Sequence, residues 1–198
     1  MYFETIIKID KAIILWLNAK VGTFIFLDKI AAWIVSDYFV PVCICLTLLF
    51  LWFYGKTTID NIKSQNIVLN SLMSIILSNS IVFTSNLFYF RDRPYETLDL
   101  NLLFYQPTDS SFPANACTVT TAIAITILFK NPRFGIPLTL LVLVFGLSRI
   151  YAGVHFPSDI VAGWLIGIFA ATLIYYLEPL LYHLYKIVFK FTRAICLS

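Results

Sequence analysis

The sequence predicts an all-α integral membrane bundle of about five transmembrane helices, with interfacial helices at both ends of the chain. Of the 198 residues, 60% are hydrophobic and only 13% are charged. A soluble domain carries about 25% charged residues, so this chain has too few polar side chains to cover a surface that faces water. The length suits one compact domain of several crossings, each of about 20 residues.

The positions of the charges predict the individual elements. Residues 2–18 mix apolar and charged positions in the way of an amphipathic helix at the membrane interface, and residues 22–36 repeat that pattern. Five apolar segments predict the crossings, at about 38–54, 65–88, 113–129, 135–151 and 156–177. The last segment, 178–198, predicts an interfacial tail. We therefore expect one domain over 1–198, with interfacial helices in 1–36, a transmembrane core over 38–177 and the tail.

Basic residues predict the orientation of the bundle. Lys56, Lys63, Lys130 and Arg133 lie in two turns that five crossings place on the same side as the tail, and the positive-inside rule makes that side cytoplasmic. The polar segment 89–112 and the turn 152–156 then face outward. A net charge of only +3 gives no support for a nucleic-acid partner, so the expected surroundings are the lipid bilayer.

Two groups of residues are expected to pack rather than react. Asn70, Ser74 and Ser78 recur every four residues on one helix face, which is typical of a helix-packing seam, with substrate contact as the alternative. The four cysteines form no metal-type CxxC pair and are expected to be small buried side chains. No His, Cys or acidic cluster has ligand spacing, so we expect no metal and no cofactor.

The segment 148–159 gives the strongest indication of chemistry. It follows the uncharged run 136–147 and places Arg149, His155 and Asp159 where one membrane helix ends and the next begins. Ionisable groups at a membrane boundary are costly and usually functional. Arginine binds phosphate oxygens, and a histidine oriented by a carboxylate is a competent nucleophile. These residues indicate phosphate chemistry, and a boundary salt bridge beside an interfacial histidine is the structural alternative.

Three segments resemble the signature motifs of the type 2 phosphatidic acid phosphatase superfamily, a family of lipid phosphate phosphatases. The third motif, Ser-Arg, five residues, His, three residues, Asp, is complete as Ser148, Arg149, His155 and Asp159. The resemblance implies that His155 attacks phosphorus and forms a phosphohistidine. It also implies that Asp159 holds the ring in the correct tautomer, and that Arg149, with Ser148 beside it, binds phosphate.

The first motif is partial. The family pattern is Lys, six residues, Arg-Pro; Arg93 and Pro94 match it, and Asn86 stands at the lysine position. The resemblance implies that Arg93 clamps phosphate, while Asn86 contributes a hydrogen bond without charge. Arg91 lies nearby and is a candidate to replace the lysine, although its spacing does not match the motif. Taken alone, the segment RDRP is an ordinary exposed charged loop.

The second motif departs most from the family. The pattern is Pro-Ser-x-His, and here Pro113 is followed by Ala114, Asn115 and Ala116, so both the serine hydroxyl and the family's general-acid histidine are missing. His183, the other histidine of the chain, lies in the predicted cytoplasmic tail. The neighbouring Cys117 carries a neutral thiol, which is a poor substitute acid.

The backbone of this motif is expected to bind phosphate even without the missing side chains. We expect Pro113 to open the third crossing, with Ser110 or Ser111 capping it nearby. The free N–H groups around Ala114, Asn115 and Ala116 are then expected to bind phosphate oxygens without a side chain.

The absence of a general acid affects which leaving group, and therefore which substrate, the site favours. A general acid contributes about 10²–10⁴-fold in rate, mostly for a basic leaving group such as an alcohol. A departing phosphomonoester, with a second pKa near ~6, needs it far less. The sequence therefore favours a diphosphate over a phosphatidate-type monoester.

This preference agrees with a resemblance to the bacterial branch of the family that acts on undecaprenyl diphosphate. That resemblance implies a phosphorylated membrane lipid as partner, the bacterial inner membrane as location and an extracytoplasmic active site. Two alternatives stay open: an impaired relative that binds or presents a phosphorylated lipid, and a lipid phosphotransferase. The sequence predicts no oligomeric state.

Overall fold

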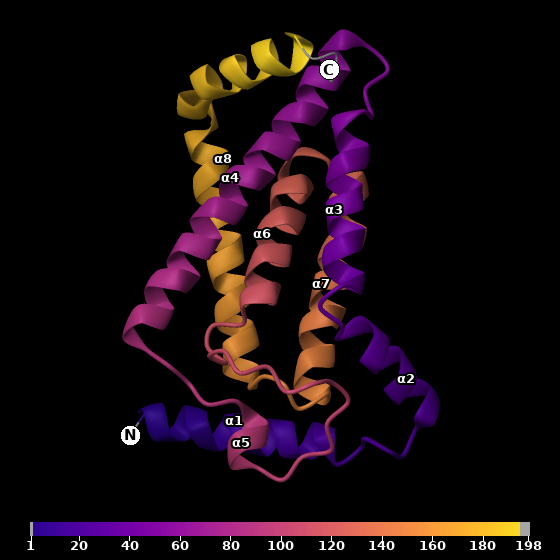
Figure 1. The fold of residues 1–198 in the computed structure, drawn as a ribbon, viewed down its shortest axis with the longest axis vertical. Helices are drawn as coiled ribbons and strands as arrows, with labels where there is room; N and C mark the ends of the chain where they lie inside the picture. The colour runs from indigo at the N-terminus through magenta and orange to yellow at the C-terminus, as the bar shows by residue number, and fades with distance from the viewer. Residues whose placement is uncertain (1, 195–198) are drawn as a thin grey trace.

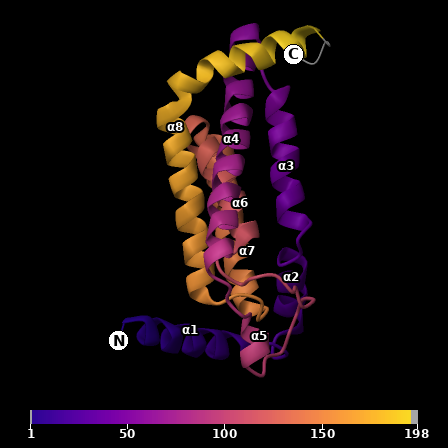
Figure 2. The ribbon, with the colours of Figure 1, turned by 60° about the vertical axis from the view of Figure 1, so that its left-hand side comes forward.

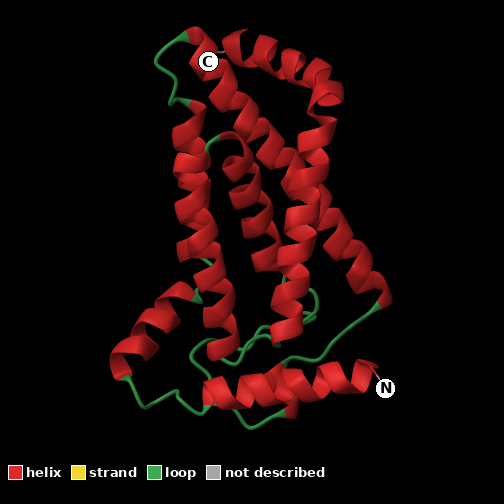
Figure 3. Ribbon diagram, turned by 180° about the vertical axis from the view of Figure 1, so that it is seen from behind, coloured by secondary structure: helices red, strands yellow, loops and turns green. Residues whose placement is uncertain are grey.

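The computed structural model describes residues 2–194, and within them the regular structure is helical (Figure 3). The all-α class predicted from the sequence is confirmed. The last part of the predicted tail, 195–198, with Cys196, lies outside the described residues. The helices are α1 (Tyr2–Asn18), α2 (Ile25–Ile34), α3 (Phe39–Trp52), α4 (Thr58–Phe88), α5 (Pro94–Thr97), α6 (Asn115–Lys130), α7 (Pro132–Tyr151) and α8 (Pro157–Ala194).

Helices α3, α4, α6, α7 and α8 run along the long axis of the molecule and correspond to the predicted crossings (Figures 1 and 2). Within the described residues, three helices are long and apolar enough to cross a membrane: α4, α7 and the part of α8 over Pro157–Thr192. Helices α2 and α3 pass the same test together, as a broken span bent by 50°. Helix α6 has 16 residues and is shorter than a full crossing. Five helices thus follow the predicted crossings, and three or four spans pass by length and composition, with α6 as a shorter apolar helix among them.

Two glycines bring α8 close to α6. A Cβ atom would lie 2.9 Å from the Ala114 carbonyl at Gly163 and 2.6 Å from the Thr118 carbonyl at Gly167. Small residues four apart allow membrane helices to approach this closely. The N–H of Ala114 donates to the carbonyl of Asp159 at 3.2 Å, so the first turns of the two helices are joined.

The polar face of α4 is a packing seam, as predicted. The Ser74 hydroxyl lies 3.0 Å from that of Thr126 on α6, and the Tyr185 hydroxyl of α8 donates to Asn70 at 2.7 Å. Ser78 donates to the carbonyl of Ile75 within α4. Of the cysteines, Cys117 is buried as expected, whereas Cys45 is exposed on α3.

The bundle has two different ends. At one end, α1 lies across the bundle, and α5 and the loops beside it cover the ends of α6, α7 and α8 (Figures 1 and 2). At the other end, the tail of α8 turns and lies across α4, with Pro179 inside the helix. Proline removes a backbone hydrogen bond and commonly kinks a helix. The expected interfacial tail is thus a continuation of the last membrane helix.

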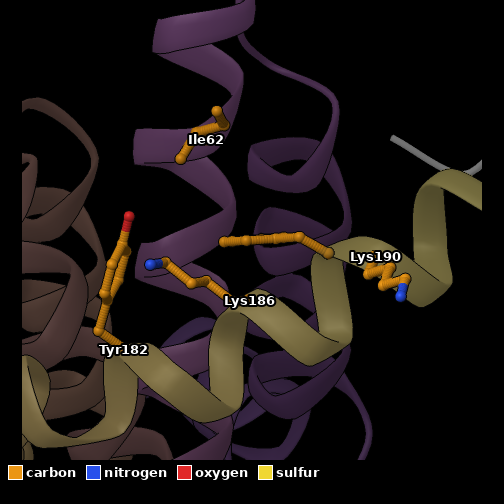
Figure 4. A pocket seen from close by; sticks show the side chains of 5 residues that line it. Ile62, Tyr182, Lys186 and Lys190 are labelled. Atoms are coloured by element: carbon orange, nitrogen blue, oxygen red, sulfur yellow. The ribbon is translucent and has the colours of Figure 1, made fainter.

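A cavity of about 350 Å³ lies under this tail, lined by Ile62, Tyr182, Lys186, Phe189 and Lys190 (Figure 4). Lys186 extends over the ring of Tyr182, with Nζ 4.7 Å from the ring centroid, and Lys190 points away from it (Figure 4). The basic side chains of the tail therefore gather at the end opposite α1.

Candidate active site

A cavity of about 160 Å³ at the α1 end gathers much of the predicted chemistry. Its wall includes five residues singled out from the sequence: Arg93, Asn115, Ala116, Arg149 and His155. These residues come from the loop before α5, the first turn of α6, the last turn of α7 and the turn before α8. The remaining lining residues, Asp37, Tyr105, Pro107 and Asp109, come from loops.

His155 is oriented by the backbone. Its Nδ1 lies 2.9 Å from the Ser111 carbonyl oxygen, which only accepts, so Nδ1 carries the proton and donates. Its Nε2 lies 3.2 Å from Nη1 of Arg93, which only donates, so Nε2 presents its lone pair. Burial, followed by the positive charges of Arg149 and Arg93, lowers the pKa of His155 well below its usual range. The ring is therefore neutral near pH 7, with an unprotonated Nε2 at the arginine side.

Asp159 does not contact the histidine ring directly. Its Oδ2 lies 4.0 Å from His155 Nδ1, and accepts instead from the Ser111 hydroxyl at 2.5 Å and from the N–H of Phe156 at 3.0 Å. The Ser111 hydroxyl takes the shorter contact with Asp159 in this structure, and the expectation that Asp159 orients the ring stays a prediction. Asp159 lies at the start of α8, where the free N–H groups of the first turn attract a carboxylate.

The two arginines are each paired with a carboxylate. Arg93 donates from Nη2 to Asp109 Oδ1 at 2.7 Å and from Nε to the Asp109 carbonyl at 3.0 Å. Arg149 donates from Nη1 to Asp37 Oδ1 at 2.9 Å, while its buried Nε has no hydrogen-bond partner in the described residues. A guanidinium donates to a carboxylate and to a phosphate in the same planar geometry. The expectation that these two side chains bind phosphate stays a prediction, and a phosphate would meet Asp37 and Asp109 as competing partners.

The first turn of α6 adds backbone donors. Asn115 and Ala116 line the cavity and open α6, where N–H groups have no partner within the helix. Such N–H groups favour anions. The N–H of Ala114, by contrast, is used by the Asp159 carbonyl, so its expected role in phosphate binding is corrected.

Two other predicted phosphate contacts are not brought to the cavity wall. Asn86 is exposed in the last turn of α4 and is not one of the lining residues. Ser148 is buried in α7, where its hydroxyl donates to the Phe145 carbonyl at 2.7 Å. The expectation that Ser110 or Ser111 caps α6 is also corrected, because Ser110 bonds to the backbone of Arg91 and Phe112.

Sequence reasoning missed the acidic partners of the arginines. Asp37 and Asp109 lie far from Arg149 and Arg93 in the chain, and no spacing rule connects them. Ser111 was considered only as a helix cap. Its position two residues before Pro113 is a usable signal, since the residues next to a motif lie close to the side chains that the motif brings together.

Comparison with known proteins settles the family. The family model described as the PAP2 superfamily matches residues 67–182, which run from α4 into α8. The chain belongs to the PAP2 superfamily. A relative in this superfamily, undecaprenyl-diphosphatase BcrC of Bacillus subtilis, is 31% identical over 85% of this chain and 84% of its own length.

Solved structures share the PAP2 fold. The crystal structure of Aquifex aeolicus LpxE superposes with a TM-score of 0.64 at 27% identity, over 82% of this chain and 92% of that one. A PAP2-type phosphatidylglycerolphosphate phosphatase of Bacillus subtilis superposes with a TM-score of 0.66 over 88% and 87% of the two chains. At 20% identity, the second likeness concerns the fold alone. The protein is therefore an integral membrane member of a lipid phosphatase family.

Proposed function

We propose that this protein hydrolyses a prenyl diphosphate, with undecaprenyl diphosphate as the physiological type, through a phosphohistidine on His155. The observation that carries the proposal is the pairing of His155 Nε2 with Arg93, at 3.2 Å, inside a cavity that Arg149 also lines. A neutral nucleophile thus lies beside two cationic phosphate ligands. The name of the Bacillus subtilis relative supports the choice of lipid.

The chemistry proceeds in two displacements. Nε2 of His155 attacks the terminal phosphorus, the bond from that phosphorus to the bridging oxygen breaks, and prenyl monophosphate leaves. The ring becomes cationic, and the Nδ1–H bond to the Ser111 carbonyl strengthens as it does. Water then attacks phosphorus and breaks the P–N bond, which gives inorganic phosphate and the neutral imidazole. Arg93 and Arg149 stabilise the charge on the phosphoryl oxygens in both steps.

Ala116 explains why a diphosphate suits this site. Its methyl group stands where the family has a general-acid histidine. Among the residues that line the cavity, no second histidine takes over that role. Tyr105 also lines the cavity, but its hydrogen bond to Asp37 raises its pKa, so it is a weak proton donor. A phosphate leaving group, with a pKa near ~6, departs without that proton more readily than an alcohol.

The orientation of the protein belongs to the same proposal. The cavity lies at the α1 end, and the tail of α8 lies at the other end (Figure 1). Lys56 lies in the turn between α3 and α4, Lys130 ends α6, and Lys186 and Lys190 belong to the tail. Applied to these residues, the positive-inside rule supports an extracytoplasmic active site. A bacterial inner membrane and one domain over 1–198 are parts of the same proposal.

The second candidate function is lipid binding without turnover. The specific observation in its favour is the pair of alanines, Ala114 and Ala116, in a phosphate site whose two arginines are intact. Such a protein would retain a phosphorylated lipid and present it to another enzyme. Transfer of the phosphoryl group from His155 to a second lipid is a related outcome of the same site.

The first expected result is selective phosphate release. Purified protein in detergent should release phosphate from undecaprenyl diphosphate and little from phosphatidate, because only the diphosphate has a weakly basic leaving group. Equal or faster release from phosphatidate would contradict the proposed selectivity. Release from neither, combined with binding of labelled prenyl phosphate, would favour the lipid-binding function. Appearance of label in another lipid rather than in water would indicate phosphotransfer.

A second expected result concerns Asp109, which competes with phosphate for Arg93. Its side chain is 70% exposed, and an exposed ion pair is worth about 0.2–1 kcal/mol. Asp109→Asn should therefore lower the KM for undecaprenyl diphosphate by up to about fivefold, with little change in kcat. Asp99→Asn, on the same polar loop but outside the cavity wall, is the matched control. An equal fall in both variants would mean that only the overall charge of this end matters.

A further inference from the structure

The buried face of α1 is unusual for a helix at a membrane surface. Over residues 4–18 of α1, the buried positions are Asp10, Ile14 and Asn18, which recur every four residues, and two of these three are polar. Asp10 is one of the charged residues in the segment 2–18, which the sequence predicts as an amphipathic helix, and the structure leaves it only 2% exposed. Burying a carboxylate in this way costs free energy unless the carboxylate is fully paired, so the groups that pair with Asp10 determine its role.

The partners of Asp10 lie on two other segments. Its Oδ2 accepts from Nη2 of Arg91 at 2.8 Å and from the Ser158 hydroxyl at 2.5 Å, and its Oδ1 accepts from the Ser158 N–H at 2.9 Å. Ser158 precedes Asp159 in the first turn of α8. Helix α1 is therefore hydrogen-bonded to the segment before α5, through Arg91, and to the first turn of α8, through Ser158.

Arg91 carries this attachment to Asp159. While Nη2 binds Asp10, Nη1 lies 2.5 Å from Asp159 Oδ1, and the guanidinium covers the ring of Phe156 at 4.3 Å. Arg91 does not line the cavity, so it does not take the place of the missing motif lysine. Its charge is used instead to fix Asp159, whose other oxygen accepts from Ser111.

A set of hydrogen bonds thus links Asp10 to Arg91, Arg91 to Asp159 and Asp159 to the Ser111 hydroxyl, and the backbone carbonyl of the same Ser111 accepts from Nδ1 of His155. With Oδ1 held by Arg91, Asp159 keeps Oδ2 on Ser111 and stays 4.0 Å from His155. If Arg91 were released, this buried carboxylate would lose a charged donor, and the Nδ1–H of His155, 4.0 Å from Oδ2 and now bonded to the Ser111 carbonyl, would become a competing partner. That change of partner would take Nδ1 away from the Ser111 carbonyl and turn Nε2 away from the phosphoryl group.

We propose that Asp10 is a positioning residue for the nucleophile: a helix outside all three motifs fixes the orientation of the His155 ring through Arg91, Asp159 and Ser111. This inference rests on the proposed role of His155. It assigns to α1 a part in the reaction beyond attachment to the membrane surface.

The test replaces the charge and keeps the shape. Asp10→Asn should lower kcat for undecaprenyl diphosphate by about tenfold to hundredfold with KM nearly unchanged, because a misplaced nucleophile affects the chemical step. Asp92→Asn, an exposed carboxylate next to Arg91, is the matched control and should behave as the unmodified protein. An unchanged kcat in Asp10→Asn, or a change confined to KM, would overturn the proposal.

A second variant tests the route. Arg91→Gln should lower kcat at least as much as Asp10→Asn, and the double variant should be no slower than Arg91→Gln alone, because Asp10 acts through Arg91. Additive losses would show two separate structural effects and overturn the route. Asp10→Glu should recover part of the activity, and it replaces Asp10→Asn in the comparison if the latter does not fold.

A spectroscopic measurement separates this inference from the proposed function. The chain has two histidines, so ¹⁵N-histidine labelling gives two sets of ring signals in lipid vesicles, with His183 as internal reference. Before substitution, His155 should show a protonated Nδ1 and an unprotonated Nε2, and Asp10→Asn should shift or mix these signals while Asp92→Asn leaves them unchanged. If the unmodified protein releases no phosphate, the proposed function fails and these signals alone decide the inference. Identical His155 signals in all three proteins would then overturn it.

Discussion

His155→Ala is expected to reduce phosphate release from undecaprenyl diphosphate by at least about 10⁴-fold, because the covalent route disappears with its nucleophile. The arginines would still be available to bind the lipid, since Arg93 and Arg149 keep their contacts with Asp109 and Asp37 when the ring is removed. The expected signature is therefore a loss in kcat with lipid binding retained. Phosphate release in detergent and binding of labelled prenyl phosphate measure the two quantities.

The matched control is His183→Ala, since His183 is exposed on the tail of α8 at the far end of the bundle. It should turn over as the unmodified protein does. Acid-labile label retained on the protein after a rapid quench, and absent from His155→Ala, would identify the phosphohistidine. Turnover of His155→Ala at the rate of the control would exclude His155 as nucleophile.

The sequence predicts the helices well because membrane burial demands apolar runs of a fixed length. The core of every expected crossing is helical in the structure. The sequence does not predict how short α6 is. The polar residues just before it, Ser110 and Ser111, lie outside the helix but are buried in the fold. Hydropathy records composition, and it does not show which polar residues the fold will cover.

The candidate site is predicted in part, and the division has a physical reason. Residues that touch a common ligand follow motif spacing, so Arg93, Arg149 and His155 are found from the sequence and meet in one cavity. Residues that hold those side chains are chosen by distance in the fold, so Asp10, Asp37 and Ser111 carry no pattern in the chain. Asp159 belongs to both classes: its motif spacing reveals it, and in the structure it accepts a hydrogen bond from Ser111.

Ala116→His is the other substitution with a large expected effect, and it acts in the opposite direction. Ala116 lines the cavity with His155 and both arginines, so an imidazole at this position would face the leaving group. We expect phosphatidate hydrolysis to rise by about 10²–10⁴-fold, because an alcohol leaving group needs a proton. Hydrolysis of undecaprenyl diphosphate should rise much less, since the departing phosphate is already a weak base. The ratio of the two rates, measured in the same detergent, reports the change in selectivity.

Ala116→Asn provides the control, because asparagine fills a similar volume and forms hydrogen bonds but does not transfer a proton at neutral pH. A gain in the histidine variant alone would mean that the rest of the site is intact and that the missing acid selects the diphosphate. Equal rates in the two variants would mean that proton transfer does not limit the reaction, and the leaving-group argument for the substrate would fail. Activity that appears only in Ala116→His, on either lipid, would instead identify the natural chain as a phosphate-binding relative with a complete nucleophile, kept from turnover by one absent imidazole.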